Sequence, residues 1–455
     1  MAHDGRGRRR GGAGAASTAS ADTLRFPLAG SGAGPRAGRT AGARGDAAAV
    51  VFPLSVAAVH WLVVHLVASV AYRSGTPNPI VSPAYQIVPP PLAGLAQVLV
   101  EPLRQWDGTW YKLIAEEGYT GFGQAKFQAA FWPLYPWLMD YGSRLTGWTV
   151  DSVGFLVSHV AFAGALILLY RLIAVDFNEA VARRTTVALA LFPTAFFFSA
   201  VYTESLFLLL VVGALLAARL GRWWVAGGVG LLAAMTRSYG VLLLLPFAVL
   251  FLQQYRLEPR RWFPDGIALA LPALGPAIFA YHLRSAIAEP LAFFTAQKGW
   301  DRYDRMPWET LRCGVVGCFN VNDDPDGVTM DWLRMLLDSP SWETVTSSSF
   351  RFAAAQSDVL ELVCTLLFLA LAVVGLRALP LYHSAYVFPA LIIPLFQPSQ
   401  VHALMSIPRF GLALFPLFVV LALLVPRRLA PLALGLSTAL LVLFTAQFVD
   451  WYWVS

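Results

Sequence analysis

A carboxylic acid surrounded by aromatic residues stands out early in the chain. Asp107 follows Trp106 and precedes Trp110 and Tyr111. Indole and phenol rings favour the boundary between membrane and water. A carboxylate held at that boundary can take a proton from a substrate hydroxyl, so Asp107 is a candidate general base. The structural alternative is that Asp107 caps an interfacial helix that the rings anchor.

Three isolated charged residues beside apolar runs could act together with this acid. Glu204 begins an apolar run, where its carboxylate could bind sugar hydroxyls or interact with a helix dipole. Arg237 has no acidic residue within nine positions on either side. Its permanently charged, planar group suits a phosphate, and pairing with Glu204 is the alternative. Arg409 begins a late apolar run in a similar way.

A further group of polar residues lies in the stretch 289–300, which is predicted to form an interfacial helix. Gln297, Lys298 and Trp300 could face a glycan or a lipid phosphate there, and surface anchoring is the alternative. The acidic run 323–326 contains a proline and is typical of a solvated turn rather than of a metal site. We expect neither a metal nor a cofactor.

The composition indicates that these residues belong to a membrane protein. Of the 455 residues, 57% are hydrophobic and 13% are charged, and the mean hydropathy is +0.59. Apolar runs of about 18 or more residues, the length that spans a bilayer, recur along the chain. We therefore expect an all-α polytopic membrane protein. Its net charge of +6 then reports orientation in the membrane and does not indicate nucleic-acid binding.

The apolar runs predict eleven membrane spans. The first, near residues 49–72, carries His60 and His65, which lie on different faces of a helix. Residues 1–49 are expected to form a disordered cytoplasmic tail, and 50–455 the membrane domain. The other ten spans are expected near 151–170, 185–202, 204–219, 223–236, 239–253, 264–284, 356–376, 381–396, 409–425 and 429–448.

Short basic loops predict the orientation of these spans. Arginines gather in alternate links, which places the N-terminus inside and the segments 73–150 and 285–355 outside. The isolated charged residues then all fall on the outer side, and we interpret this side as the one that carries the functional site. Within the outer segments, residues 92–117 are expected to form an amphipathic interfacial helix. Cys313 and Cys318 are expected to form a disulfide.

The order of several short motifs resembles the PIG-V mannosyltransferase family, and its bacterial members in particular. The resemblance covers roughly residues 50–455. It is carried by Trp106-Asp107, Gly118-Tyr119, Phe131-Trp132-Pro133-Leu134-Tyr135-Pro136, Phe192-Pro193-Thr194-Ala195, Tyr202-Thr203-Glu204-Ser205, Thr236-Arg237-Ser238-Tyr239-Gly240, Glu289-Pro290-Leu291-Ala292-Phe293, Gln297, Trp300 and Pro408-Arg409-Phe410.

The resemblance implies a GT-C membrane glycosyltransferase that uses polyprenyl-phosphate-mannose, with Asp107 as catalytic base. The expected acceptor is a glycolipid, a glycan or a protein, and the expected location is a bacterial plasma membrane. An acid often follows the Gly-Tyr pair in this family, and residues 121–124 replace it here. The difference concerns whether the acceptor is the family's glycolipid and leaves the expected donor unchanged. The expected substrate-binding residues are Trp106, Tyr111, Glu204, Arg237, Gln297, Lys298, Trp300 and Arg409.

A flippase or transporter of polyprenyl-linked sugars is the alternative function. Such a protein would also bind a lipid phosphate and a sugar, but it needs polar residues through the bundle that open to both sides. Here the chemically unusual residues gather on one predicted face, which favours the enzyme.

Overall fold

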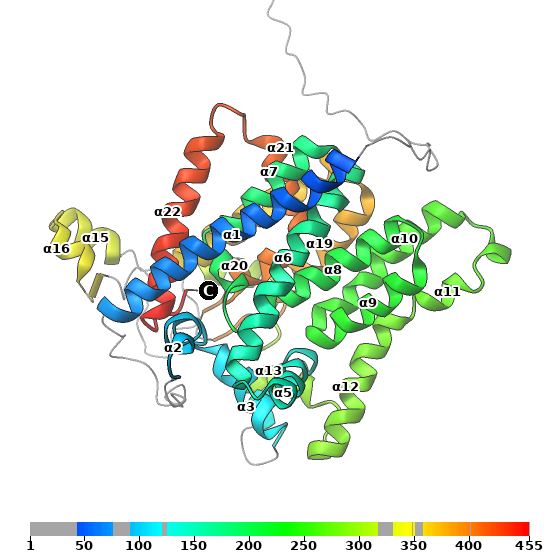
Figure 1. Cartoon of the computed structure of the whole chain (residues 1–455), viewed down its shortest axis with the longest axis horizontal. Coiled ribbons are helices and arrows are strands. Elements are labelled where there is room, and N and C mark those ends of the chain that lie inside the picture. Colours follow the sequence, from blue (N-terminus) through cyan, green and yellow to red (C-terminus); the bar gives the residue numbers. More distant parts are fainter. Residues whose placement is uncertain are drawn as a thin grey trace, which may run out of the picture. The chain divides into compact units, whose positions relative to one another are not determined.

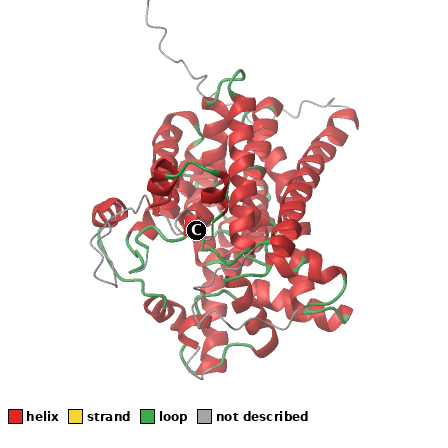
Figure 2. Cartoon of the chain, turned by 90° about the vertical axis from the view of Figure 1, so that its left-hand side faces the viewer, coloured by secondary structure: helices red, strands yellow, loops and turns green. Residues whose placement is uncertain are grey.

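The computed structural model describes residues 43–75, 92–120, 125–316, 331–347, 349–350, 358–400 and 402–454. Figures 1 and 2 draw these residues as helices joined by loops. The β pairing in this part of the chain is one isolated bridge between Arg302 and Ser399. The expected all-α architecture is therefore confirmed.

Five described helices are long and apolar enough, by length and composition, to cross a membrane. A sixth candidate is a bent pair whose two parts meet at 86°. The expected polytopic membrane protein is confirmed, and the count of eleven spans stays a prediction. The five are α1 (Ala43–Ser74), α6 (Val150–Asp176), η4 (Ser238–Leu243) with α10 (Leu244–Tyr255), α18 (Asp358–Ala378) and α22 (Ala430–Val449); the bent pair is α20 (Ile407–Phe410) and η6 (Gly411–Ala413), then α21 (Phe415–Leu424).

Shorter helices occupy most of the other expected spans, with one correction. The predicted span 185–202 is wrong, because α7 ends at Ala190 and the chain turns through Pro193 before η3 (Ala195–Phe198). Proline removes one helical hydrogen bond and disfavours helix in the residue before it. Other helices of the chain tolerate this at Pro53, Pro276 and Pro389, whereas at Pro193 the chain turns. The shorter helices are α7 (Glu179–Ala190), α8 (Glu204–Arg219), α9 (Trp223–Thr236), α11 (Asp265–Ala268), α12 (Leu271–Ile287) and α19 (Leu381–Leu395).

The first long link contains several short helices instead of the single interfacial helix predicted over 92–117. Pro102 lies in a 3₁₀ turn, and Trp106 adopts a φ of 54°, so the helical path is interrupted twice. The prediction also failed because three charged residues of this stretch, Glu101, Arg104 and Asp107, are buried among partners and do not face solvent. The helices are α2 (Leu95–Leu99), η2 (Glu101–Leu103), α3 (Asp107–Glu117), α4 (Ala125–Gln128) and α5 (Leu134–Thr146).

The second long link contains the predicted helix over 289–300, which is α13 (Ala292–Gly299). Helix α13 packs against α4, and Trp300, which follows α13, contacts the ring of Trp110 in the first long link. The two long links therefore meet. The other helices of this link are α14 (Pro307–Val316), α15 (Asp331–Asp338) and α16 (Trp342–Thr346), and η5 (Pro259–Arg261) lies earlier, between α10 and α11.

Several sequence expectations fall partly or wholly outside the described residues. Cys313 is disulfide-bonded and Cys364 is free and buried, and the expected partner Cys318 lies outside the described residues. The acidic run 323–326 also lies outside them, as do residues 1–42 of the expected tail. The described part of the chain begins with α1 at Ala43, inside the range 1–49 expected for the tail, and the boundary of the membrane domain stays a prediction.

Helices α6, α8 and α9 form the centre of the bundle. Helix α8 packs against α6 and α9, and α9 packs against α12. On the periphery, α1 and α22 expose rows of leucines, such as Leu62 and Leu432. Exposed apolar rows on long helices are the surfaces expected to contact lipid. Because α8 is buried along its length, its first residue, Glu204, is also held inside the protein.

The backbone leaves α9 by a tight turn that depends on one glycine. A Cβ atom on Gly240 would lie 2.3 Å from backbone atoms of Ala233 and Ala234, well below any normal contact. The chain after α9 therefore packs directly on the backbone of that helix. This close approach fixes the direction of the backbone at Arg237, the C-cap residue of α9.

We predict that Gly240→Ala destabilises the protein by about 1–3 kcal/mol, because the added methyl group meets backbone that cannot move aside. Gly228→Ala, within α9, is the matched control. A Cβ there meets nothing within 4 Å, and alanine favours the helix. Thermal unfolding in detergent measures both variants, and equal melting temperatures would contradict the packing described.

Candidate active site

Asp107 is the first residue of α3, but it does not cap that helix. The N-cap position is Trp106, and no side chain makes a capping hydrogen bond there. The Asp107 amide donates to the hydroxyl of Tyr202 at 3.0 Å, and that hydroxyl donates to the Gln105 carbonyl at 3.0 Å. The carboxylate itself contacts Arg409. The capping alternative considered from the sequence is wrong.

Four charged side chains form a chain of alternating sign. Asp107 Oδ2 lies 2.5 Å from Arg409 Nη1, and Arg409 Nε lies 3.4 Å from Glu204 Oε1. Glu204 Oε1 also lies 2.5 Å from Arg237 Nη1. The four residues come from α3, α20, the start of α8 and the end of α9. The pairing of Arg237 with Glu204, one of two interpretations from the sequence, is therefore present.

Because this chain of charges is buried, its ion pairs are screened little by water, and each charge needs a partner. The Glu204 side chain is 2% exposed, and those of Arg409 and Asp107 are 9% and 10% exposed. A charge removed from water is costly unless an opposite charge and hydrogen bonds replace the lost hydration. Arg237 is held further by the ring of Phe410, 4.9 Å from its guanidinium carbon. Each acid is therefore placed by an arginine, and each arginine by an acid.

A second buried cluster holds α3 against the bundle. Arg104 donates to Glu101 at 2.6 Å and to Asp151 at 2.7 Å, and all three residues are buried. Glu101 also accepts the backbone amide of Leu92 at 2.8 Å. Since Asp151 lies in the first turn of α6, this cluster ties the segment before Asp107 to a membrane-spanning helix.

Two buried phenols lie beneath the charged chain. Burial is the main cause that raises the pKa of Tyr111 and of Tyr202, and the nearby carboxylates add to it. Both phenols therefore stay protonated at neutral pH and can donate hydrogen bonds. The Tyr111 hydroxyl lies 3.1 Å from that of Thr203, the residue before Glu204. The backbone around each acid is thus braced by a tyrosine.

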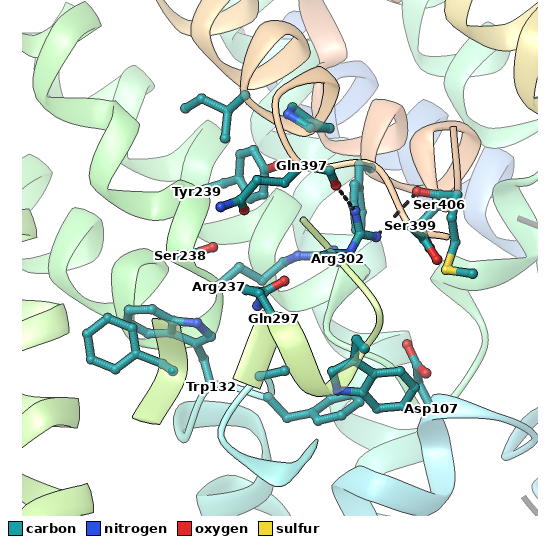
Figure 3. Close-up of a pocket in the computed structure, with 18 of the residues that line it drawn as sticks. Asp107, Trp132, Arg237, Ser238, Tyr239, Gln297, Arg302, Gln397, Ser399 and Ser406 are labelled. Carbon is teal, nitrogen blue, oxygen red and sulfur yellow. Dashed lines mark hydrogen bonds between the residues drawn. The ribbon is translucent and has the colours of Figure 1, made fainter. Parts of the chain in front are cut away.

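A cavity of about 1380 Å³ opens beside the charged chain. Aromatic and apolar side chains line it together with charged and polar ones, some of which are labelled in Figure 3. The aromatic side chains suit an apolar chain or the face of a sugar ring. The aromatic lining residues include Trp106, Trp110, Phe127, Phe131, Trp132, Phe293, Phe294 and Trp300; the charged and polar ones include Asp107, Arg237, Ser238, Gln297, Asp301, Arg302, Asp304, Gln397, Ser399, His402, Ser406 and Arg409.

Most of the residues singled out from the sequence meet at this cavity. Glu204 lies behind the wall and holds Arg237 and Arg409 from there. Lys298 lies on the exposed face of α13 and is not among the lining residues, so we leave it out of the site. The residues that do line the cavity are Trp106, Asp107, Tyr111, Arg237, Gln297, Trp300 and Arg409.

Sequence reasoning missed Arg302 and the loop that follows α19. Arg302 stands in the run Trp300-Asp301-Arg302-Tyr303-Asp304-Arg305, whose alternating charges are typical of a solvated segment. Its position on the cavity wall depends on pairing with residues almost a hundred positions later. The one available signal was the closeness of this run to Gln297 and Trp300.

Residues 49–257 match the family described as Mannosyltransferase (PIG-V). The matched region contains Asp107, Glu204 and Arg237, and it ends before α13 and Arg409. The resemblance inferred from the motifs is confirmed over this region. Searches of curated proteins and of solved structures found no match to the chain.

We predict that Arg409→Gln destabilises the unliganded protein by about 3 kcal/mol, because it leaves Asp107 and Glu204 with one arginine between them. Adding Asp107→Asn removes one of the unpaired charges and should recover part of the loss. A double-mutant cycle measured by unfolding in detergent gives the coupling energy. Lys298→Gln is the control, with no expected change. Additive effects at positions 107 and 409 would contradict the pairing.

Proposed function

We propose that the chain, whose residues 49–257 match the PIG-V mannosyltransferase family, moves a mannosyl residue from polyprenyl-phosphate-mannose to an acceptor hydroxyl. The proposed acceptor is a glycolipid, glycan or protein at the extracytoplasmic face of a bacterial plasma membrane. The observation that carries the proposal is the cavity, which is lined by a carboxylate, several arginines and many aromatic side chains. A lipid-linked sugar phosphate has groups that match this lining, because arginines suit its phosphate and aromatic rings suit its sugar and its apolar chain.

The free oxygen of Asp107 supports its proposed role as base. Oδ2 is bound by Arg409, whereas Oδ1 accepts no hydrogen bond from any described residue. Because Asp107 lines the cavity, that oxygen can accept the proton of an acceptor hydroxyl. The Arg409 contact also fixes the orientation of the carboxylate. An oriented base contributes to the rate by removing the need to search for the reactive geometry.

The proposed reaction is a single displacement with inversion at the anomeric carbon. The acceptor oxygen forms a bond to that carbon as Asp107 takes its proton, and the bond from the carbon to the phosphate oxygen breaks. The electron pair of the broken bond stays with polyprenyl phosphate, which gains negative charge. Arginines on the cavity wall stabilise that developing charge. The aromatic side chains of the cavity accommodate the sugar and the first part of the lipid.

The closed opposite end of the bundle supports an enzyme rather than a transporter. The 27 residues of α6 span roughly 40 Å between the cluster at Asp151 and the far end at Asp176. At that far end, Asp176 accepts hydrogen bonds from Arg219 at 2.9 Å and from Tyr382, and it lies 2.9 Å from His383 Nε2. Asp176 and His383 are almost completely buried. A transport path would have to open this packed cluster.

Asp107→Asn tests the proposed base. Asparagine keeps the shape of the side chain but cannot take the proton, so transfer of radiolabelled mannose from polyprenyl-phosphate-mannose should fall about 10²- to 10⁴-fold. Asp140→Asn is the matched control, because Asp140 lies in the same long link, outside the cavity lining, and pairs with the exposed Arg144. Full activity of the Asp107→Asn protein would overturn the role of Asp107 as base.

Cysteine labelling tests the proposed side of the membrane. Arg144 is exposed near the end of α5, and Arg260 is exposed in the link between α10 and α11. In intact cells, Arg144→Cys should react with an impermeant thiol reagent, whereas Arg260→Cys should react only after permeabilisation. The reverse pattern would place the cavity on the cytoplasmic side and overturn the extracytoplasmic assignment.

A further inference from the structure

Arg302 differs from the other two arginines of the cavity wall. Arg237 is paired with Glu204, and Arg409 with both Asp107 and Glu204. Arg302 forms no ion pair with a carboxylate of the described residues. Among the described residues, its guanidinium donates only to main-chain carbonyl groups, to Gln397 at 2.9 Å through Nη1 and to Met405 at 3.5 Å through Nη2. Neutral carbonyls leave its full positive charge in place.

The acids near Arg302 do not cancel this charge. Asp301 and Asp304 also line the cavity, but both are exposed, so water screens their charges. Glu361 and Asp107 act on Arg302 only at longer range. Burial is the main cause that lowers the pKa of Arg302, and the like charge of Arg409 adds to it. Two cations held near each other around a cavity create a favourable position for an anion.

The backbone holds Arg302 in place before any ligand arrives. Residues 301–305 run antiparallel to residues 396–400, with the bridge between Arg302 and Ser399. The Tyr303 amide donates to the Pro398 carbonyl at 3.2 Å, and the Arg305 amide donates to the Phe396 carbonyl at 2.9 Å. The Arg302 amide itself donates to Gln297 at the end of α13. An arginine whose backbone and guanidinium are both held by hydrogen bonds loses little conformational entropy when it binds a ligand.

We propose that Arg302 is the residue that binds the phosphate of the lipid-linked donor and of the departing polyprenyl phosphate. This assignment rests on the proposed function and refines it, because Arg237 and Arg409 then serve mainly to hold Glu204 and Asp107. A guanidinium has five N–H donors, and Arg302 uses two of them on carbonyl groups. The remaining donors can form a forked contact with two phosphate oxygens. Figure 3 shows Arg302 between Arg237 and the Gln397 loop, within the cavity.

The charge change during the reaction predicts which lipid Arg302 binds best. The donor is a phosphodiester with one negative charge. The product is a phosphomonoester, whose second ionisation lies near pH 6, so it carries nearly two. Arg302 should therefore contribute more to binding the product than the donor. The same preference stabilises charge as the bond to the sugar breaks.

Direct lipid binding by the full-length protein tests the assignment. The probes are polyprenyl phosphate and uncharged polyprenol of the same chain length, and their affinities are measured in detergent from the shift in melting temperature. Arg302→Gln keeps a group that can donate to a carbonyl but removes the charge. We expect its affinity for polyprenyl phosphate to fall about 10- to 100-fold and its affinity for polyprenol to stay unchanged. Arg305→Gln, an exposed arginine of the same segment, should match the wild type.

A structural role for Arg302 gives a different result. If Arg302 only tied residues 301–305 to the Gln397 loop, Arg302→Gln would either weaken the binding of both lipids to the same extent or leave both affinities unchanged. Either result overturns the assignment. Should Arg302→Gln fail to fold, Arg302→Lys decides, since it keeps the charge and loses the fork. We expect Arg302→Lys to lose part of the affinity for polyprenyl phosphate alone. An affinity equal to that of Arg305→Gln would overturn the assignment.

The same experiment separates this assignment from the proposed function. A wild-type protein that transfers mannose, together with an Arg302→Gln protein that binds polyprenyl phosphate equally well, would overturn only the role of Arg302. A wild-type protein that neither binds polyprenyl phosphate nor transfers mannose would overturn the proposed function, and the role of Arg302 with it.

Discussion

The structure around the cavity depends on the mutual neutralisation of four buried charges. Glu204 is nearly inaccessible to water, so it requires Arg237 and Arg409 on one side of the cavity wall. Asp107 in turn requires Arg409. Since a buried unpaired charge costs several kcal/mol, the elements that carry these residues cannot separate independently. The helices α3, α8, α9 and α20 therefore stay in register at one end of the bundle, although they come from distant parts of the chain.

This constraint also explains why a cavity so rich in polar groups can remain open in an apolar protein. Three of its charged lining residues, Asp107, Arg237 and Arg409, form ion pairs within the protein, and many of the other lining residues are aromatic. These ion pairs form without a ligand. Arg302 differs, since among the described residues its guanidinium donates only to carbonyl groups. The protein thus separates the charges that build the site from the one that we assign to ligand binding.

Much of the helix arrangement could be predicted from the apolar runs, because a bilayer-spanning helix needs about 20 apolar residues whatever surrounds it. The isolated charges at Asp107, Glu204, Arg237 and Arg409 were found for a related reason: a charge beside an apolar run needs a partner. The break at Pro193 was also visible, but the aromatic run around it resembled a span. Arg302 could not be found in this way, because its place is set by main-chain pairing with residues 396–400, which leaves no pattern in either segment.

The late position of Arg409 in the chain has a consequence for how the protein is made. Asp107 and Arg409 are separated by 302 positions. A ribosome adding about 5–20 residues per second needs roughly 15–60 s to cover that distance. Glu204 can pair with Arg237 soon after both are synthesised, whereas Asp107 must wait for α20. Until then, the acid has to remain hydrated at the membrane surface. Completion of the site is therefore among the last steps of biogenesis. In a chain truncated before α20, Asp107 has no Arg409 to pair with.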